Sequence, residues 1–142
     1  MKRIADNSEE QIRIAVLYCQ HTVSRKASVA PAAEKVKGVT IRAAMMPCSS
    51  KVQASHLLKI LDREADGVEV VACSDRACRF LNGSQRAAKR VAYTRRLLDE
   101  VGVGSERGGI SRQAGLSAEQ LMELAVARAA AVEKIGNNGE SQ

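Results

Sequence analysis

Three short apolar runs in this chain each end at a cysteine. They read Ile12-Arg-Ile-Ala-Val-Leu-Tyr-Cys19, Val39-Thr-Ile-Arg-Ala-Ala-Met-Met-Pro-Cys48 and Val68-Glu-Val-Val-Ala-Cys73, and Cys78 follows the third run. Their length and their many β-branched and aliphatic residues predict buried strands. Because the carboxyl ends of parallel strands meet at one edge of an open sheet, we expect all four cysteines to gather at that edge.

The segments between these runs predict helices. We expect strands at 12–19, 39–46 and 68–72, a weak fourth strand within 106–114, and helices at 31–37, 53–64, 85–101 and 117–135. Ser117 and Gln120 have the spacing of a capping box that opens the last helix, and Gly136 is expected to end it. Alternating strands and helices predict a three-layer α/β fold of the flavodoxin or Rossmann kind, with a four-stranded, mostly parallel sheet flanked by helices.

The length of 142 residues suits one domain with a single core. We expect a flexible N-terminal tail at 1–11, a single α/β domain at 12–136 and a C-terminal tail at 137–142. No stretch approaches the roughly 18 consecutive apolar residues of a membrane span, and the N-terminus lacks the apolar core of a signal peptide. The sequence therefore favours a cytoplasmic protein.

The net charge of +6 is mildly basic, and much of it lies between Arg86 and Arg96 on a predicted helix. At helical spacing, such a cluster is most often a solvent-exposed face. One phenylalanine, two tyrosines and no tryptophan leave few aromatic rings for stacking on bases. These features argue against a nucleic-acid-binding protein.

The cysteines point to a metal cluster. In a reducing compartment, cysteines more often bind metals or act as redox-active thiols than form structural disulfides. A [2Fe-2S] cluster takes four thiolate ligands, and the spacing from Cys73 to Cys78 is wide enough for two sulfurs to straddle it. Zinc is less favoured because its sites are often built on closer C-x2-C pairs. The alternative for any one cysteine is a buried, small apolar residue.

Four neighbouring residues could act on such a site. Arg76, Arg79 and Lys51 lie close to cysteines in the sequence, and their positive charge would stabilise thiolates and tune a cluster, although each has an equally simple interpretation as a solvated loop residue. His21 is a possible alternative ligand, since imidazole binds iron in Rieske-type centres. A lone loop histidine is more often a surface residue.

At these residues the chain resembles the delta subunits of methyl-viologen-reducing hydrogenases, also called hydrogenase iron-sulfur subunits. The resemblance covers about 12–135 and is clearest at Cys48-Ser-Ser-Lys-Val52, at Ala65-Asp-Gly-Val68 and at Cys73-Ser-Asp-Arg-Ala-Cys78. The family's first block is usually Cys-Cys-x-x-Cys. Here only Cys19 is present, and Tyr18 and Thr22 occupy the positions of its companions.

The resemblance implies an iron-sulfur domain with one [2Fe-2S] cluster on Cys19, Cys48, Cys73 and Cys78. It also implies a non-catalytic electron-transfer subunit of an oxidoreductase complex, which relays electrons between a flavin- and cluster-bearing flavoprotein of the heterodisulfide reductase A-like kind and a partner such as a hydrogenase or formate dehydrogenase. Two alternatives stay open. One is a thiol-based redox or sulfur-transfer protein using Cys73 and Cys78, and the other is an adaptor of the same complex without a cluster.

Overall fold

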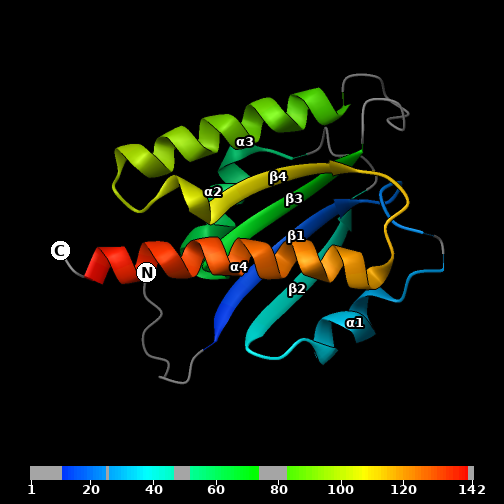
Figure 1. The fold of residues 1–142 in the computed structure, drawn as a ribbon. Helices are drawn as coiled ribbons and strands as arrows, with labels where there is room; N and C mark the ends of the chain where they lie inside the picture. Colours follow the sequence, from blue (N-terminus) through cyan, green and yellow to red (C-terminus); the bar gives the residue numbers. More distant parts are fainter. Residues whose placement is uncertain (1–10, 25, 47–51, 74–82, 141–142) are drawn as a thin grey trace.

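The computed structural model describes residues 11–24, 26–46, 52–73 and 83–140 of the chain (Figure 1). The elements follow one another as β1 (Ile12–Cys19), α1 (Val29–Lys35), β2 (Val39–Met46), α2 (Ala54–Arg63), β3 (Gly67–Cys73), α3 (Gly83–Glu100), the short 3-10 helix η2 (Ser105–Arg107), β4 (Gly108–Gln113) and α4 (Ala118–Glu140). This alternation is the α/β order predicted from the sequence. None of the described helices is long and apolar enough to cross a membrane.

The four strands form one parallel sheet in the order β2-β1-β3-β4. The first four strands of flavodoxin-like sheets have this order, and the chain reverses its winding direction between β1 and β3. Doubly wound sheets bind their ligands at such a reversal, outside the carboxyl ends of the strands. Cys19 and Cys73 are the last residues of the two strands that flank this point.

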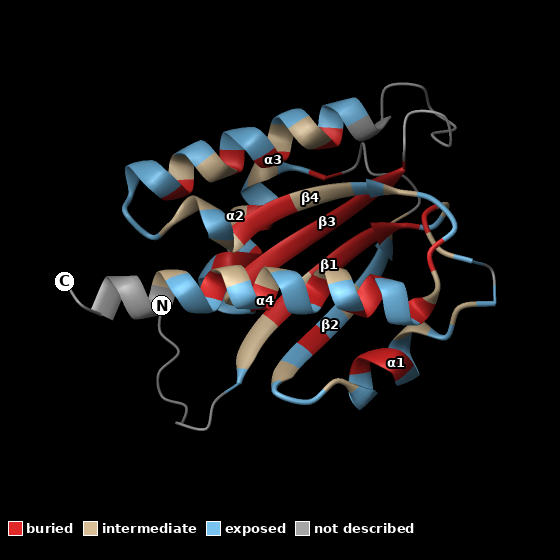
Figure 2. Cartoon of the chain, in the orientation of Figure 1, coloured by how far each residue is buried: buried red, intermediate tan, exposed pale blue. Residues whose placement is uncertain are grey.

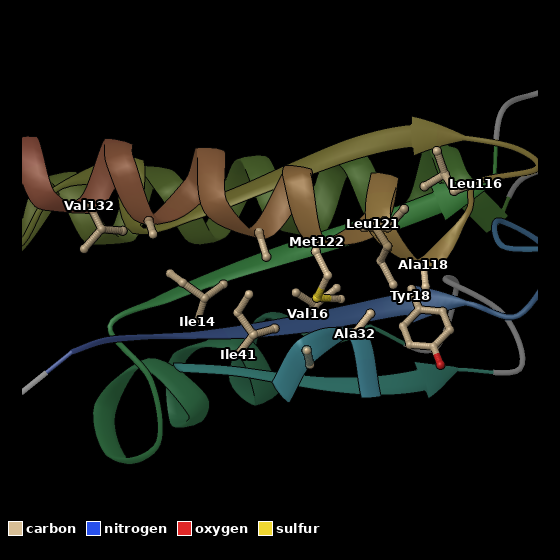
Figure 3. Packing of buried hydrophobic residues seen from close by; sticks show 14 residues of the cluster. Ile14, Val16, Tyr18, Ala32, Ile41, Leu116, Ala118, Leu121, Met122 and Val132 are labelled. Carbon is tan, nitrogen blue, oxygen red and sulfur yellow. The ribbon is translucent and has the colours of Figure 1, made fainter. Parts of the chain in front are cut away.

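Helices cover both faces of the sheet and produce the three-layer architecture. On one face, α1 and α4 cover an apolar cluster that includes Ile14, Val16 and Leu121 (Figures 1 and 3). On the other face, α2 and α3 cover a second cluster that includes Leu17 and Val70. Both inner strands are therefore deeply buried, and every residue of β3 is buried (Figure 2). This agrees with the continuous apolar runs seen in the sequence.

A capping box explains where the last helix begins. Ser117 and Gln120 form the predicted capping box: the Gln120 backbone N–H donates to Ser117 Oγ at 3.1 Å, and the Ser117 N–H donates to Gln120 Oε1 at 2.9 Å. The prediction that Gly136 ends this helix is wrong, because α4 continues to Glu140. A glycine within a helix costs only about 1 kcal/mol relative to alanine, so it does not by itself stop a long helix.

The first helix begins and ends two residues earlier than predicted. It spans Val29–Lys35, and Pro31 lies in its first turn, where the missing backbone N–H is tolerated. Gly38 adopts a φ of +86°, which suits glycine, in the turn that leads into β2. The weak fourth strand is confirmed as Gly108–Gln113, and it pairs with β3 along its whole length.

Candidate metal centre at the carboxyl edge of the sheet

The ends of β1 and β3 place two thiols side by side. Cys19 Sγ and Cys73 Sγ lie 3.2 Å apart, and the two residues are 1% and 2% exposed. The two sulfurs are not joined in a disulfide with each other, since that bond would need an S–S distance of about 2.05 Å. They form a small buried cluster separate from the two apolar cores. Two of the four predicted ligands are thus brought together at the predicted edge.

Backbone and side-chain hydrogen bonds hold the turn that follows Cys19. The Cys19 carbonyl accepts from the backbone N–H of Thr22 at 2.9 Å and from its hydroxyl at 2.7 Å. Thr22 is fully buried. Its carbonyl accepts from the Leu116 N–H, and the Ser24 N–H donates to the Leu116 carbonyl, both at 2.8 Å. The segment after Cys19 is therefore tied to the loop after β4, which fixes the direction in which β1 ends.

The thiol pair suits two ligands of one tetrahedral metal ion. Metal–sulfur bonds of about 2.3 Å at a tetrahedral angle would put two sulfurs about 3.8 Å apart. The observed 3.2 Å differs from this by about half an ångström, which small side-chain rotations can supply. Thiolates are also the soft ligands that iron-sulfur clusters require. These two thiols and their burial therefore fit part of the ligand set of an iron-sulfur group.

Most of the other predicted site residues fall outside the part of the chain that the structure describes. Cys48, Cys78, Lys51, Arg76 and Arg79 lie outside the described residues, so their roles stay predictions. Among the residues described, no three His, Cys, Asp or Glu side chains are grouped so as to hold a metal ion. His21 therefore does not complete a three-ligand site with the two described cysteines.

His21 instead lines a hollow of about 590 Å³ on the α1 side of the same edge, together with Tyr18 and Met45. This hollow is open toward solvent, and Met45 is 59% exposed there. This hollow is thus accessible, whereas Cys19 and Cys73 do not line it and are buried.

The structure explains what Tyr18 and Thr22 do in place of thiols. Tyr18 packs into the apolar cluster beneath α1 and α4 (Figure 3), and burial raises the pKa of its hydroxyl above the ordinary value. Thr22 is the site residue whose role the sequence analysis missed. Its position three residues after Cys19, at the end of a strand, is the spacing of a hydroxyl that closes a turn.

Comparison with known proteins gives consistent matches. A family model described as methyl-viologen-reducing hydrogenase, delta subunit matches residues 14–136. The chain is 30% identical over 99 residues to the vhu iron-sulfur subunit of the F420-non-reducing hydrogenase of Methanocaldococcus jannaschii, covering 70% of this chain and 74% of that protein. The iron-sulfur subunit of the F420-non-reducing hydrogenase of Archaeoglobus profundus is 25% identical over 130 residues, covering 92% and 95% of the two chains.

Proposed function

The chain belongs to the family of methyl-viologen-reducing hydrogenase delta subunits, and from this premise we propose that it is an electron-transfer subunit with one [2Fe-2S] cluster. The proposed ligands are Cys19, Cys48, Cys73 and Cys78. The observation that carries the proposal is the 3.2 Å separation of two buried thiols at the reversal point of the sheet.

A cluster at this place would exchange single electrons, and the protein would supply ligands and a rigid frame. Cys19 and Cys73 end adjacent parallel strands, and hydrogen bonds from Thr22 hold the turn beyond Cys19. Such a frame limits the movement of the ligands when the charge changes. Burial of both cysteines keeps water away from the sulfurs, which is one of the factors that set a cluster's potential.

The proposed partners are larger redox proteins. We propose that electrons pass between a heterodisulfide reductase A-like flavoprotein and a hydrogenase, a formate dehydrogenase or a comparable enzyme. The similarity to iron-sulfur subunits of F420-non-reducing hydrogenases supports a place in a hydrogenase complex. The proposed role includes no acid–base catalysis, because an electron relay needs only a cluster and surfaces on which its partners dock.

Anaerobic purification tests the cluster directly. The expected result is iron and acid-labile sulfide in a ratio near one, two irons per chain, and the EPR spectrum of a reduced [2Fe-2S] centre. Cys19→Ser and Cys73→Ser should each lose the centre or alter its spectrum. Ser24→Ala, a change in the loop beside the site, should keep both the iron content and the spectrum.

A protein that stays colourless and free of iron after anaerobic reconstitution with iron and sulfide would contradict the cluster. If the purified protein contained zinc instead of iron, the four cysteines would instead form a structural zinc site, in which all four positions around the metal are filled by thiolates. If Cys19→Ser and Cys73→Ser variants still assembled with the flavoprotein and supported turnover, the chain would act as an adaptor and not as a relay.

A thiol-based redox role is the second candidate. The sequence predicts Cys73 and Cys78 as its thiols, but Cys78 lies outside the described residues, and the 3.2 Å distance between the sulfurs of Cys19 and Cys73 favours this pair instead. In that case the two thiols would lose two electrons and two protons to a disulfide acceptor and form a disulfide of their own. Their exposures of 1% and 2% count against it, since an acceptor must reach a sulfur. Fast alkylation of the metal-free native protein would support this candidate, and rates at or below those of an ordinary cysteine would reject it.

A further inference from the structure

Helix α3 carries a continuous stripe of exposed polar side chains along its outer side. The stripe, which we call the α3 stripe, consists of residues spaced three or four apart, so that they share one helix face. Its members are Arg86, Lys89, Tyr93, Arg96 and Glu100, and none of them is buried. Arg86, Lys89 and Arg96 form no ion pair with any residue in the described part of the chain.

The order of charges on α3 opposes the stability of the helix. The first turn of α3 contains no acidic residue and the last turn no basic one, while Asp99 and Glu100 lie at its carboxyl end. A helix is stabilised by the opposite arrangement, at about 0.3 to 1 kcal/mol for each suitably placed charge. Helix α4 has Glu119 in its first turn and the capping box of Ser117. The charges at the two ends of α3 therefore do not stabilise the helix through its dipole.

Tyr93 lies in the middle of the α3 stripe and is 47% exposed. The guanidinium of Arg96 lies over its ring, 5.5 Å from the centroid, which is the geometry of a cation–π contact. The chain has only three aromatic residues, and it places this one at the surface. Tyrosine and arginine are enriched in the energetically important centres of protein interfaces.

The basic end of the α3 stripe lies at the edge of the sheet that holds the thiol pair. Since α3 follows β3 and runs back along the sheet, its amino-terminal end lies at the carboxyl edge of the strands (Figure 1). The Arg90 guanidinium donates to the Val52 carbonyl at 2.8 Å and thus anchors this part of α3 to the start of α2. An anionic surface attracted to Arg86 and Lys89 would be brought to the same edge of the sheet as Cys19 and Cys73.

The change of sign along the α3 stripe favours a protein over a nucleic acid. A phosphate backbone is uniformly negative and would meet Glu100 as well as Arg86. A protein surface can present carboxylates to the cations and a basic group to Glu100, and such a match also fixes the orientation of docking.

We propose that the α3 stripe is the docking surface for the acidic face of a flavin-bearing electron-transfer protein. This inference deepens the proposed function and rests on it, because the docked partner exchanges one electron with the centre at Cys19 and Cys73. The attraction of Arg86, Lys89 and Arg96 speeds the encounter, and Tyr93 contributes contact area at the centre of the interface.

The test uses the cluster-loaded protein and an acidic flavodoxin as the probe. Stopped-flow mixing with reduced flavodoxin measures the rate constant of electron transfer, and titration onto immobilised flavodoxin measures binding whether or not a cluster is present. The Arg86→Gln/Lys89→Gln/Arg96→Gln variant should lower the rate constant and the affinity at least about tenfold at low salt, and in about 1 M salt the difference should vanish. Tyr93→Ala should weaken binding, and Tyr93→Phe should largely retain it.

The matched control is Lys35→Gln/Lys37→Gln/Lys134→Gln, which removes three cations from the side of α1 and α4. It should change rate and affinity by less than about twofold. Equal losses in both triple variants, or no binding by the unaltered protein, would overturn the docking surface. Tighter binding of a DNA duplex of about 20 base pairs, lost in the α3 variant, would overturn it in favour of nucleic acid. A protein without a cluster that still binds through α3 would reject the relay but keep the docking surface.

Discussion

Glu69 on β3 forms a buried ion pair with Arg128 on α4, with Glu69 Oε1 and Arg128 Nε 2.8 Å apart. The second carboxylate oxygen of Glu69 accepts from the Ser111 hydroxyl at 2.7 Å. Arg128 also donates to the Glu106 carbonyl at 2.9 Å. A charge within a strand whose residues are all buried requires such partners. This pair therefore links the central strand, the edge strand and the last helix.

Removing Arg128 should destabilise the fold strongly. Arg128→Met keeps a long side chain but leaves the Glu69 carboxylate buried without its counter-charge. We expect the free energy of unfolding, measured in urea, to fall by about 3 to 5 kcal/mol. The double variant Glu69→Leu/Arg128→Met should recover much of this loss, since it removes both charges.

The exposed pair between Arg95 and Glu106 is the control for this experiment. These side chains are 36% and 51% exposed, and their closest atoms lie 3.3 Å apart. Arg95→Met should therefore change the free energy of unfolding by less than about 1 kcal/mol. A similarly small effect for Arg128→Met would mean that the buried pair does not stabilise α4 on the sheet.

Gly109 is required because the guanidinium of Arg128 lies against its backbone. A methyl group at this position would overlap Arg128 Nη2. Gly109→Ala should lower the free energy of unfolding by about 1 to 3 kcal/mol, since it adds a group to a filled space. The neighbouring glycine is the matched control: at Gly108 a methyl group would meet only ordinary contacts, and its φ of −125° suits any residue. Gly108→Ala should be neutral or slightly stabilising, and equal losses for both would contradict the role of Arg128.

The sheet could be predicted from the sequence because its inner strands are continuous apolar runs. β1 and β2 were predicted with the bounds that they have, and β3 to within a residue at each end. The limits of α1 and α4 were less predictable. Proline fits several positions of a first turn, and glycines near a helix end are tolerated at a modest energetic cost. Glu69 is a charged residue inside an apolar run, but no partner for it was predicted, and nothing in the sequence identifies Arg128 as that partner.

The meeting of Cys19 and Cys73 was predictable for the same reason as the sheet. Parallel strands bring their carboxyl ends together, so Cys19 and Cys73 meet although 54 positions separate them in the sequence. The apolar pattern that predicts a strand gives no information on the turn that follows the strand's carboxyl end. The hydrogen bond from Thr22 to the Cys19 carbonyl, and the tie to Leu116, depend on a loop geometry that no periodicity encodes.

Ser117 should contribute measurably to the stability of α4. Its hydroxyl accepts from the Gln120 backbone N–H, and the Gln120 side chain accepts in return from the Ser117 N–H. Ser117→Ala should lower the free energy of unfolding by about 1 kcal/mol. Ser28 holds the equivalent position before α1 but makes no capping hydrogen bond through its side chain. Ser28→Ala should therefore have little effect, and a comparable loss there would show that the measured effect is not capping.

Tyr18 should make the stability of the protein fall at high pH. Burial raises the pKa of its hydroxyl above the ordinary value of 10.0, so the native state keeps a proton that the unfolded chain loses as the pH passes that value. The contribution of the protonated Tyr18 hydroxyl to the free energy of unfolding is therefore present below about pH 10. It is lost as the pH rises through the raised pKa. In a Tyr93→Phe background, where Tyr18 is the remaining tyrosine, ultraviolet titration should give a midpoint above the ordinary value. Tyr18→Phe in that background should flatten the fall in unfolding free energy above about pH 10, and a midpoint at or below the ordinary value would contradict burial of the hydroxyl.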